Sequence, residues 1–145
     1  MRRPLTALAL TAAVVAAAGC GDRTPSDEEQ VRDLLATFSR SVEKRDYQTL
    51  CDDVLAPSLL NGLEGIGLPC EVALRNSLGQ VSEPRLTVGA VKVTGAKASA
   101  EVRTSAQGQQ PSSDTIELVK IDGAWKVSDL SSGPAQASPS ATATR

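Results

Sequence analysis

The chain has 145 residues, with 15 basic and 17 acidic side chains and no histidine. Aromatic residues make up 2% of it, so a folded core must consist mostly of Leu, Val, Ile and Ala, with few rings to stack on a flat ligand. Nucleic-acid binding needs a basic face that displaces counterions from phosphates. No stretch beyond the N-terminus clusters Lys and Arg, so we expect no nucleic-acid partner.

Residues 1–19 have the pattern of an export signal. Arg2 and Arg3 precede an apolar run from Leu5 to Ala18, and small residues follow. A basic start, a short apolar stretch and small residues before a cleavage point are typical of a secretory signal peptide. The run is shorter than the about 20 residues that a membrane-spanning helix needs. We therefore predict a signal peptide that is removed on export.

The end of this signal, Ala17-Ala18-Gly19-Cys20, resembles the lipobox of bacterial lipoproteins. The resemblance implies cleavage before Cys20 and a diacylglycerol on its thiol. It also implies that membrane lipid is a partner and that the protein is anchored on the outer face of the cytoplasmic membrane, in the cell envelope. A plain secretory signal with an incidental cysteine is the alternative.

Cleavage leaves a chain long enough for one small domain. Residues 20–25 form a short lipidated tether, and residues 26–130 form the domain. Residues 131–145 are mostly Ser, Ala, Pro and Thr with almost no apolar bulk, so we expect a disordered tail, whose glycosylation stays open.

The first helix is predicted from Ser26, which can cap it, to near Lys44. Glu29, three residues after Ser26, completes a capping-box pattern. Apolar residues then recur at helical spacing on one face, namely Val31, Leu34, Leu35, Phe38 and Val42.

Two more helices are predicted, joined by a loop. Asp46 looks like the cap of the second, which Pro57 stops or kinks. The glycine-rich stretch Asn61–Pro69 reads as a loop, with one helical turn around Leu59–Leu63. The third helix opens at Cys70 and ends at Gly79.

Cys51 and Cys70 remain as an even pair once Cys20 carries lipid. In an oxidising compartment such a pair predicts a disulfide, here joining the second and third helices. Two buried free thiols are the alternative, and a redox-active pair is disfavoured because no CxxC spacing occurs.

From Arg85 onward the apolar period changes to strict alternation, which predicts four strands. A phase slip beside Gly89 indicates a β-bulge in the first strand, and a second phase change falls in the third strand. Ser105–Ser113 reads as a polar connection, and Asp122-Gly123 as a hairpin turn. The alternating residues are Leu86, Val88, Val91, Val93, Ala98, Ala100, Val102, Ile116, Leu118, Val119, Ile121, Trp125 and Val127, and the last strand ends near Leu130.

Helices followed by a meander of about four antiparallel strands make an α+β fold. The segment Glu29–Leu55 with its run YQTLCDDVL, the cysteine pair and the closing DGAWKVSDL resemble small actinobacterial lipoproteins with an NTF2-like (SnoaL-like, cystatin-like roll) domain. The resemblance implies N-terminal helices packed on a curved sheet, forming a cone. Many members have a hairpin or extra strands where this chain has Asn61–Pro69, which implies a trimmed or distorted cone. The fold serves enzymes and binding modules alike, so it does not decide the activity.

Enzymes of this superfamily use an Asp or His in the cone, with Tyr or Asp as hydrogen-bond donors. The chain has no His, which removes the commonest general base near neutral pH. Tyr47 lies in register with apolar helical positions, so we interpret it as a packing residue. Asp52 and Asp53 are helical neighbours about 100° apart, which favours a solvated face over an acid–base pair.

Asp129 shares a predicted strand face with Trp125 and Val127, so it could enter the mouth of the cone, although a strand-end charge near solvent is favoured. We therefore assign no catalytic residue. No metal is expected, because Cys and His pairs for zinc and oxygen-rich loops for calcium are missing. No cofactor is expected either, because the glycine-rich stretch lacks the Lys-Ser/Thr of a phosphate loop.

These observations predict a membrane-anchored lipoprotein with a non-catalytic binding or interaction module. One alternative is an enzyme of the same fold, with Asp129 or Asp53 as base, acting on a small hydrophobic substrate. Another is a carrier that holds a lipid or other apolar ligand in the cone. Small residues such as Ala98, Ala100 and Val102 could leave a cavity there, or helical Leu and Val could fill it.

Overall fold

The structure is a computed structural model that describes residues 24–65 and 67–131. The predicted signal peptide, including the cleavage site, and the predicted tail from residue 132 lie outside the described residues. The elements in chain order are α1 (Asp27–Lys44), α2 (Tyr47–Thr49), the π-helix η1 (Leu50–Val54), α3 (Pro57–Gly65), α4 (Cys70–Leu78), β1 (Arg85–Thr94), β2 (Lys97–Ser105), β3 (Ser112–Ile121) and β4 (Ala124–Ser131).

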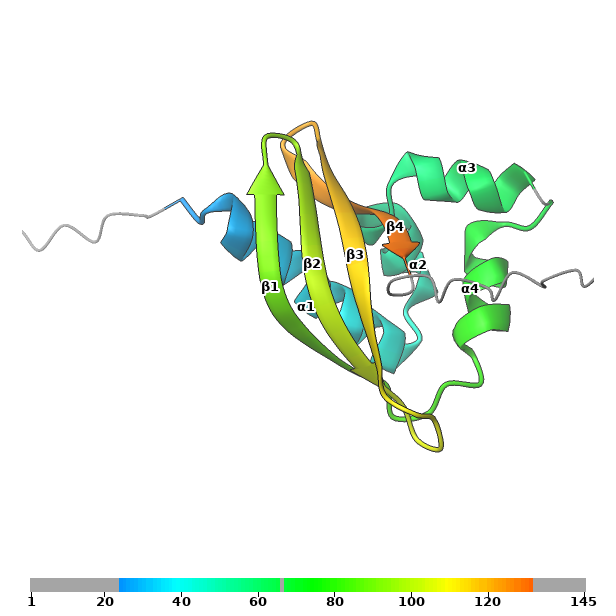
Figure 1. Ribbon diagram of the computed structural model, residues 1–145. Coiled ribbons are helices and arrows are strands. Elements are labelled where there is room, and N and C mark those ends of the chain that lie inside the picture. Colours follow the sequence, from blue (N-terminus) through cyan, green and yellow to red (C-terminus); the bar gives the residue numbers. More distant parts are fainter. Residues whose placement is uncertain (1–23, 66, 132–145) are drawn as a thin grey trace, which may run out of the picture.

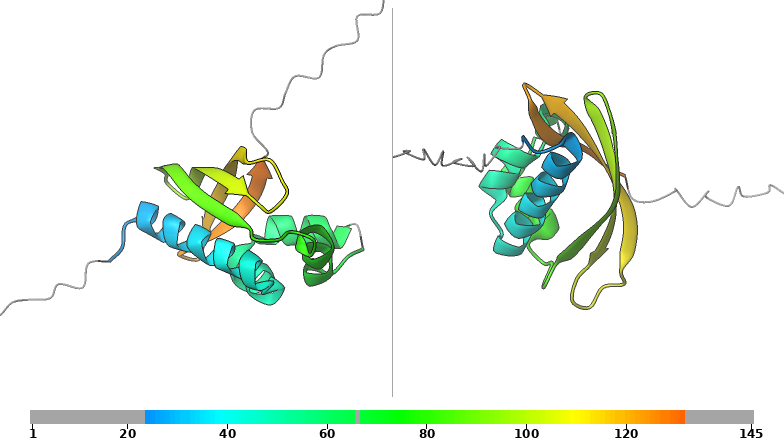
Figure 2. Two further views of the ribbon diagram at one scale, coloured as in Figure 1. Left: turned by 90° about the horizontal axis from the view of Figure 1, so that it is seen from below. Right: turned by 90° about the vertical axis from the view of Figure 1, so that its left-hand side faces the viewer.

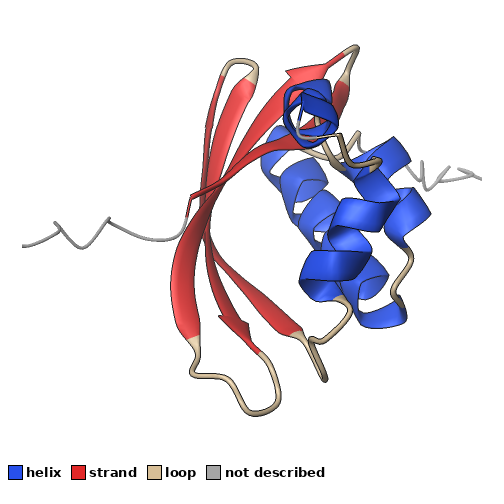
Figure 3. Ribbon diagram, turned by 90° about the vertical axis from the view of Figure 1, so that its right-hand side faces the viewer, coloured by secondary structure: helices blue, strands red, loops and turns tan. Residues whose placement is uncertain are grey.

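The helices lie on one face of a bent antiparallel sheet. In the described part of the chain the sheet has four strands in the order β1-β2-β3-β4, so each strand pairs with the next (Figure 1). Figures 2 and 3 show the sheet curving around α1, which lies along its concave side. The predicted α+β fold is confirmed. None of the described helices has the length and apolar character needed to cross a membrane.

Helix α1 begins where its capping residues predict. The backbone N–H of Glu29 donates to Ser26 Oγ at 3.3 Å, and Glu29 Oε2 accepts from the Ser26 backbone N–H at 2.6 Å. This reciprocal pair satisfies two backbone donors at the helix start, and the Ser26 N–H lowers the pKa of the Glu29 carboxyl. The helix ends at Lys44 because Arg45 adopts the left-handed conformation, with φ of 58°.

The second predicted helix is present but changes type along its length. Asp46 caps it as predicted, accepting from the Thr49 backbone N–H at 3.1 Å, and this contact lowers the pKa of Asp46. After one turn of α2 the chain continues as the π-helix η1 and becomes extended at Leu55. The Ala56 N–H then donates to the Val127 carbonyl at 2.8 Å, which fixes the end of this segment against β4.

The predictions for Pro57 and for the glycine-rich stretch after it are wrong in part. Pro57 does not stop or kink the second helix but is the first residue of α3, where a missing N–H leaves no helical bond unmade. The helix also runs through to Gly65, beyond the single turn predicted at Leu59–Leu63. Its half-buried Leu59 and Leu60 pack against the core, and this packing outweighs the low helix propensity of glycine.

Helix α4 begins at Cys70 and ends before Gly79, as predicted. The predicted disulfide between Cys51 and Cys70 is present, with the two Cα atoms 6.1 Å apart. It connects η1 to α4 and closes a loop that contains α3. The segment that contains α3 is therefore held at both ends by one covalent bond.

The first two strands carry the bulge that the sequence indicates. Val88 pairs with Val102 and Val91 with Ala100, so two residues of β1 lie opposite one residue of β2 beside Gly89. A Cβ on Gly89 would lie 3.3 Å from the Glu101 carbonyl oxygen. The bulge lets β1 bend around α1.

The turn between β3 and β4 is also as predicted. Asp122 and Gly123 both have positive φ, of 50° and 83°, as a two-residue hairpin of the type I′ class requires. The start of β3 differs from the prediction, because Ser112 and Ser113 belong to the strand. They extend the ladder by pairing with Thr104 and Arg103, although both are polar.

The second phase change lies in β4 rather than in β3. Leu118 pairs with Val127 and Glu117 with Asp129, which leaves Ser128 as the extra residue of a bulge. Beyond Ser128 the alternation of β4 is therefore inverted. Leu130 lies opposite the buried Ile116 and therefore points to the inner face of the sheet, whereas Asp129, opposite Glu117, points to the outer face.

The core lies between α1, η1 and the concave face of the sheet. Leu35 and Leu50 are fully buried there, and Ala98 and Ala100 of β2 are 3% and 0% exposed. Small residues on the sheet allow the helices to approach closely, so this end of the cone is filled. The fully buried side chains that carry most of the packing are Leu35, Leu50, Leu118, Val31, Val54 and Val127.

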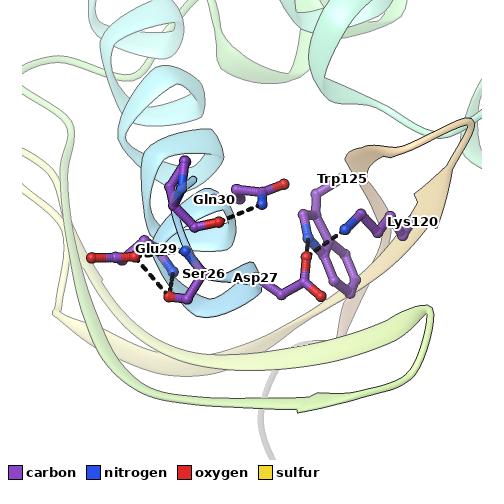
Figure 4. Close-up of polar contacts among 7 residues, drawn as sticks. Ser26, Asp27, Glu29, Gln30, Lys120 and Trp125 are labelled. Carbon is purple, nitrogen blue, oxygen red and sulfur yellow. Dashed lines mark hydrogen bonds and ion pairs between the residues drawn. The ribbon is translucent and has the colours of Figure 1, made fainter. Parts of the chain in front are cut away.

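A polar cluster ties the start of α1 to the β3–β4 hairpin (Figure 4). Asp27 Oδ1 accepts from Lys120 Nζ and, at 3.3 Å, from Trp125 Nε1, and the Lys120 ammonium lies 5.7 Å from the centre of the Trp125 ring. The Lys120 contact comes first among the causes that lower the pKa of Asp27. The cluster covers the filled end of the cone.

Candidate functional site

The cone is open at the end opposite to the Asp27 cluster. Val102, further along β2 than the two alanines, borders a cavity of about 470 Å³, which we call the cone cavity. It lies between the second half of α1, the segment that joins α4 to β1, and the ends of β2, β3 and β4. Side chains of the helices therefore fill the cone at one end only. Apolar side chains dominate its walls, including Phe38, Val42, Leu78, Leu86, Val102 and Ile116.

One wall of the cone cavity carries a polar cluster of three side chains on β2 and β3. Ser112 Oγ donates to Asp114 Oδ2 at 2.6 Å, and Thr104 Oγ1 lies 2.8 Å from Ser112 Oγ. Thr104 Oγ1 also lies 3.5 Å from Asp114 Oδ2. Asp114 pairs with Val102, and Ser112 with Thr104, so all three share the face of the sheet that bounds the cavity.

Asp114 is the site residue that the sequence analysis missed. The sequence did contain a signal for this residue. Asp114 lies two and four positions before Ile116 and Leu118, so its side chain points to the same concave face, on which both are buried. The polar run before Ile116 hid the start of the strand, so the alternation was not extended back to Asp114.

Asp129 does not enter the cone: the predicted shared face with Trp125 and Val127 is wrong, whereas the favoured interpretation, a strand-end charge near solvent, agrees with its exposed side chain. The bulge at Ser128 places Asp129 opposite Glu117, in the phase of the outer face, and its side chain is exposed. Leu130 borders the cone cavity instead.

The other sequence candidates also lie away from the cone cavity. Asp52 and Asp53 are exposed, and their backbone carbonyls accept from Lys126 Nζ. Tyr47 is 7% exposed in the core cluster, and no described residue offers its hydroxyl a hydrogen bond. Cys20, the predicted lipidation site, lies outside the described residues.

Metal-ligating side chains do not gather in the described part of the chain. No group of three or more His, Cys, Asp or Glu residues is arranged there to hold an ion. Asp114 has two hydroxyls beside it but no second carboxylate among the described residues that line the cone cavity. The chemistry of the site is therefore that of apolar walls with one carboxylate–hydroxyl cluster and further polar residues such as Gln109 and Gln110 in the lining.

Comparison with known proteins identifies the fold. No protein-family model and no curated protein sequence matches the chain. A crystal structure of an NTF2-like protein of unknown function from Shewanella baltica OS155 matches 70% of this chain and 87% of its own, with 14% identity and a TM-score of 0.49. The de novo designed NTF2 fold protein NT-9 matches 73% of this chain and 87% of its own, with 14% identity and a TM-score of 0.50. The domain has an NTF2-like fold.

Within this NTF2-like domain, the cone cavity combines space, apolar walls and one polar wall. Small-molecule sites are concave, mostly apolar and hold a few placed polar groups, at volumes of about 300 to 1,000 Å³. The cone cavity falls within that range. Its polar cluster would orient a ligand, whereas the apolar walls would supply most of the binding free energy by removing ligand surface from water.

Proposed function

We propose that the chain is a lipid-anchored binding module of the bacterial cell envelope, whose NTF2-like domain holds a small, largely apolar ligand in its cone cavity. The observation that carries this proposal is the open, apolar cavity of about 470 Å³ at one end of an otherwise packed cone. A cavity of this size would cost stability if its apolar walls met only water, which is consistent with selection for an occupant.

The anchored location is supported by the sequence and by the disulfide. Residues 1–19 have the pattern of a lipoprotein signal that ends at Cys20, where a diacylglycerol would attach. A disulfide between Cys51 and Cys70 suits a compartment outside the cytosol. The proposed small actinobacterial type of lipoprotein rests on the resemblance carried by Glu29–Leu55, the cysteine pair and the closing DGAWKVSDL.

A catalytic role for the two acids first considered has little support. Neither Asp53 nor Asp129 borders the cone cavity. A role based only on protein interaction is also less well supported, because Val72 and Leu130 are the exposed large apolar residues of the described chain and Leu130 lies at the cavity itself.

The test is a variant that fills the cone cavity. Ser39 is half-buried on α1 and lines the cavity, so Ser39→Phe should place a ring inside it. The probe is N-phenyl-1-naphthylamine, a small neutral apolar fluorophore, added to the anchored chain in lipid nanodiscs with empty nanodiscs as blank. We expect saturable binding to the wild type and at least a roughly tenfold weaker Kd for Ser39→Phe, equal to the loss of about 1.4 kcal/mol.

Ala36→Phe is the matched control, because Ala36 lies on the same helix and is exposed to solvent. It adds the same ring and should leave the Kd unchanged. Wild-type chain that binds no probe above the blank, or equal affinity in Ser39→Phe, would contradict the proposed ligand site.

A further inference from the structure

The lining of the cone cavity changes from polar and exposed at one end to apolar and buried at the other. Val102 and Ile116 are 4% and 3% exposed and are the buried residues of the described lining, so they form its floor. The polar side chains of the lining that are exposed to solvent lie at its mouth, namely those of Arg85, Gln109, Gln110 and Ser112. The cavity therefore has a polar mouth and an apolar floor.

The register of β2 and β3 gives the direction of this change. Thr104 pairs with Ser112 near the mouth, at the end of the strands that the glutamine-containing loop connects. Ile116 lies four residues beyond Ser112, and a strand rises about 3.3 Å per residue, so mouth and floor are about 13 Å apart along β3. Ala100, the partner of Ile116, is fully buried in the core. An elongated ligand therefore fits with its long axis along the strands.

The hydrogen bonds of the sheet wall lie on the side of the mouth. Asp114 Oδ2 accepts from Ser112 Oγ at 2.6 Å, and Thr104 Oγ1 lies 2.8 Å from the same hydroxyl oxygen. The floor instead presents the methyl groups of Val102 and Ile116. A polar group of a ligand would lose its water there without gaining a hydrogen bond from either side chain, which costs free energy. The apolar end of a ligand is therefore the end that suits the floor.

We propose that the ligand of the cone cavity is a single-chain amphiphile that binds apolar end first, and that Val102 limits the length of chain that the cavity admits. The polar end stays at the mouth, and the chain lies along the apolar side chains of Phe38, Val42 and Leu86. Val102 has this role because its inward neighbour on the same face of β2 is the small Ala100, so a shorter side chain at Val102 would extend the cavity. This inference rests on the proposed function, because it specifies the ligand class of the same cavity.

The experiment compares Val102→Ala with the wild type over the even-numbered alcohols from 1-hexanol to 1-dodecanol. Each alcohol displaces N-phenyl-1-naphthylamine from the anchored chain in nanodiscs, and its Kd is calculated with the Kd of the fluorophore for the same variant. Partition of the alcohol into the lipid is the same for both proteins, so it cancels in the ratio of the two Kd values. We expect a ratio near one for 1-hexanol, and for 1-dodecanol a Kd about fourfold lower in Val102→Ala for each further methylene that the extra space admits.

Val93→Ala is the matched control. Val93 lies on β1 opposite Ala98, and it is half-buried but does not line the cone cavity. The same truncation there should leave the ratio near one for every alcohol. Should Val102→Ala fail to fold, nuclear Overhauser effects in the wild type decide the question, because the terminal methyl of 1-octanol should contact Val102 and Ile116 rather than Gln109.

The outcomes separate this inference from the proposed function. A ratio that is the same at every chain length, or a terminal methyl that contacts the mouth, would overturn the apolar-first arrangement while leaving the apolar site intact. Absence of displacement by every alcohol would overturn both.

Discussion

Cys20→Ala is expected to abolish lipid labelling of the protein and to leave the precursor with its signal peptide attached. The thiol of Cys20 is the proposed site of the diacylglycerol, and its modification would precede cleavage. The apolar run before it is too short to span a membrane as a helix, so without lipid the attachment loses its main source of free energy. Two acyl chains anchor firmly, at about 0.8 kcal/mol per buried methylene, and the Cys20→Ala precursor has no acyl chain.

The measurement is metabolic labelling with an alkyne fatty acid, combined with the mass of the purified chain. Cys51→Ala is the matched control, since it removes a different cysteine and should leave labelling and cleavage unchanged. Equal labelling of the wild type and Cys20→Ala would contradict the lipobox interpretation.

Removal of the disulfide is expected to lower the free energy of unfolding by about 3 kcal/mol, which the chain-entropy model gives for a closed loop of this size. The bridge between Cys51 and Cys70 spans 19 positions and encloses α3. The stability of a small domain is about 5 to 15 kcal/mol, so this is a large share of it. The melting temperature should fall by about 12 to 24 °C, because about 1 kcal/mol corresponds to roughly 4 to 8 °C in a domain of this size.

The variant for this test is Cys51→Ala with Cys70→Ala, which leaves no single thiol to form bridges between molecules. Thermal unfolding followed by circular dichroism measures the change, and reduction of the wild type should give a similar loss. A melting temperature that stays the same after both treatments, or exported protein in which mass mapping finds both thiols free, would contradict the structural role of the bridge.

Sequence reasoning succeeded where a local pattern decides the structure. The capping box of Ser26 and Glu29 and the helical spacing after it determine α1. Asp122-Gly123 determines the hairpin because both residues tolerate positive φ. The slip beside Gly89 marks a bulge because the apolar alternation is clear on both sides of it.

Sequence reasoning failed where tertiary packing overrides the local preference of the residues. Helix α3 crosses Gly62 because Leu59 and Leu60 bury their side chains against the core. The bulge at Ser128 is marked in the sequence by one residue only, Leu130, which lies three positions rather than two beyond Val127. The bulge places Asp129 in the phase of the outer face, and a single apolar residue at the end of the strand was a weaker signal than the alternation on both sides of Gly89.

The cone cavity itself could not be derived from composition. Ala98, Ala100 and Val102 follow one another on the same face of β2, yet the alanines are packed and Val102 borders the cavity. The difference depends on where α1 and η1 cross the sheet, which is a property of the assembled fold.

The most direct test of the central claim is to locate the ligand on the domain. In a titration of the isotope-labelled anchored chain with 1-octanol, followed by backbone amide NMR, we expect the largest shifts at residues around the cone cavity, such as Phe38, Leu86, Val102 and Asp114. Amides at the filled end, such as those of Ala98 and Trp125, should move little. Shifts confined to the outer face of the sheet, or no shifts up to the solubility limit of the alcohol, would contradict the claim that the open end of the cone binds apolar ligands.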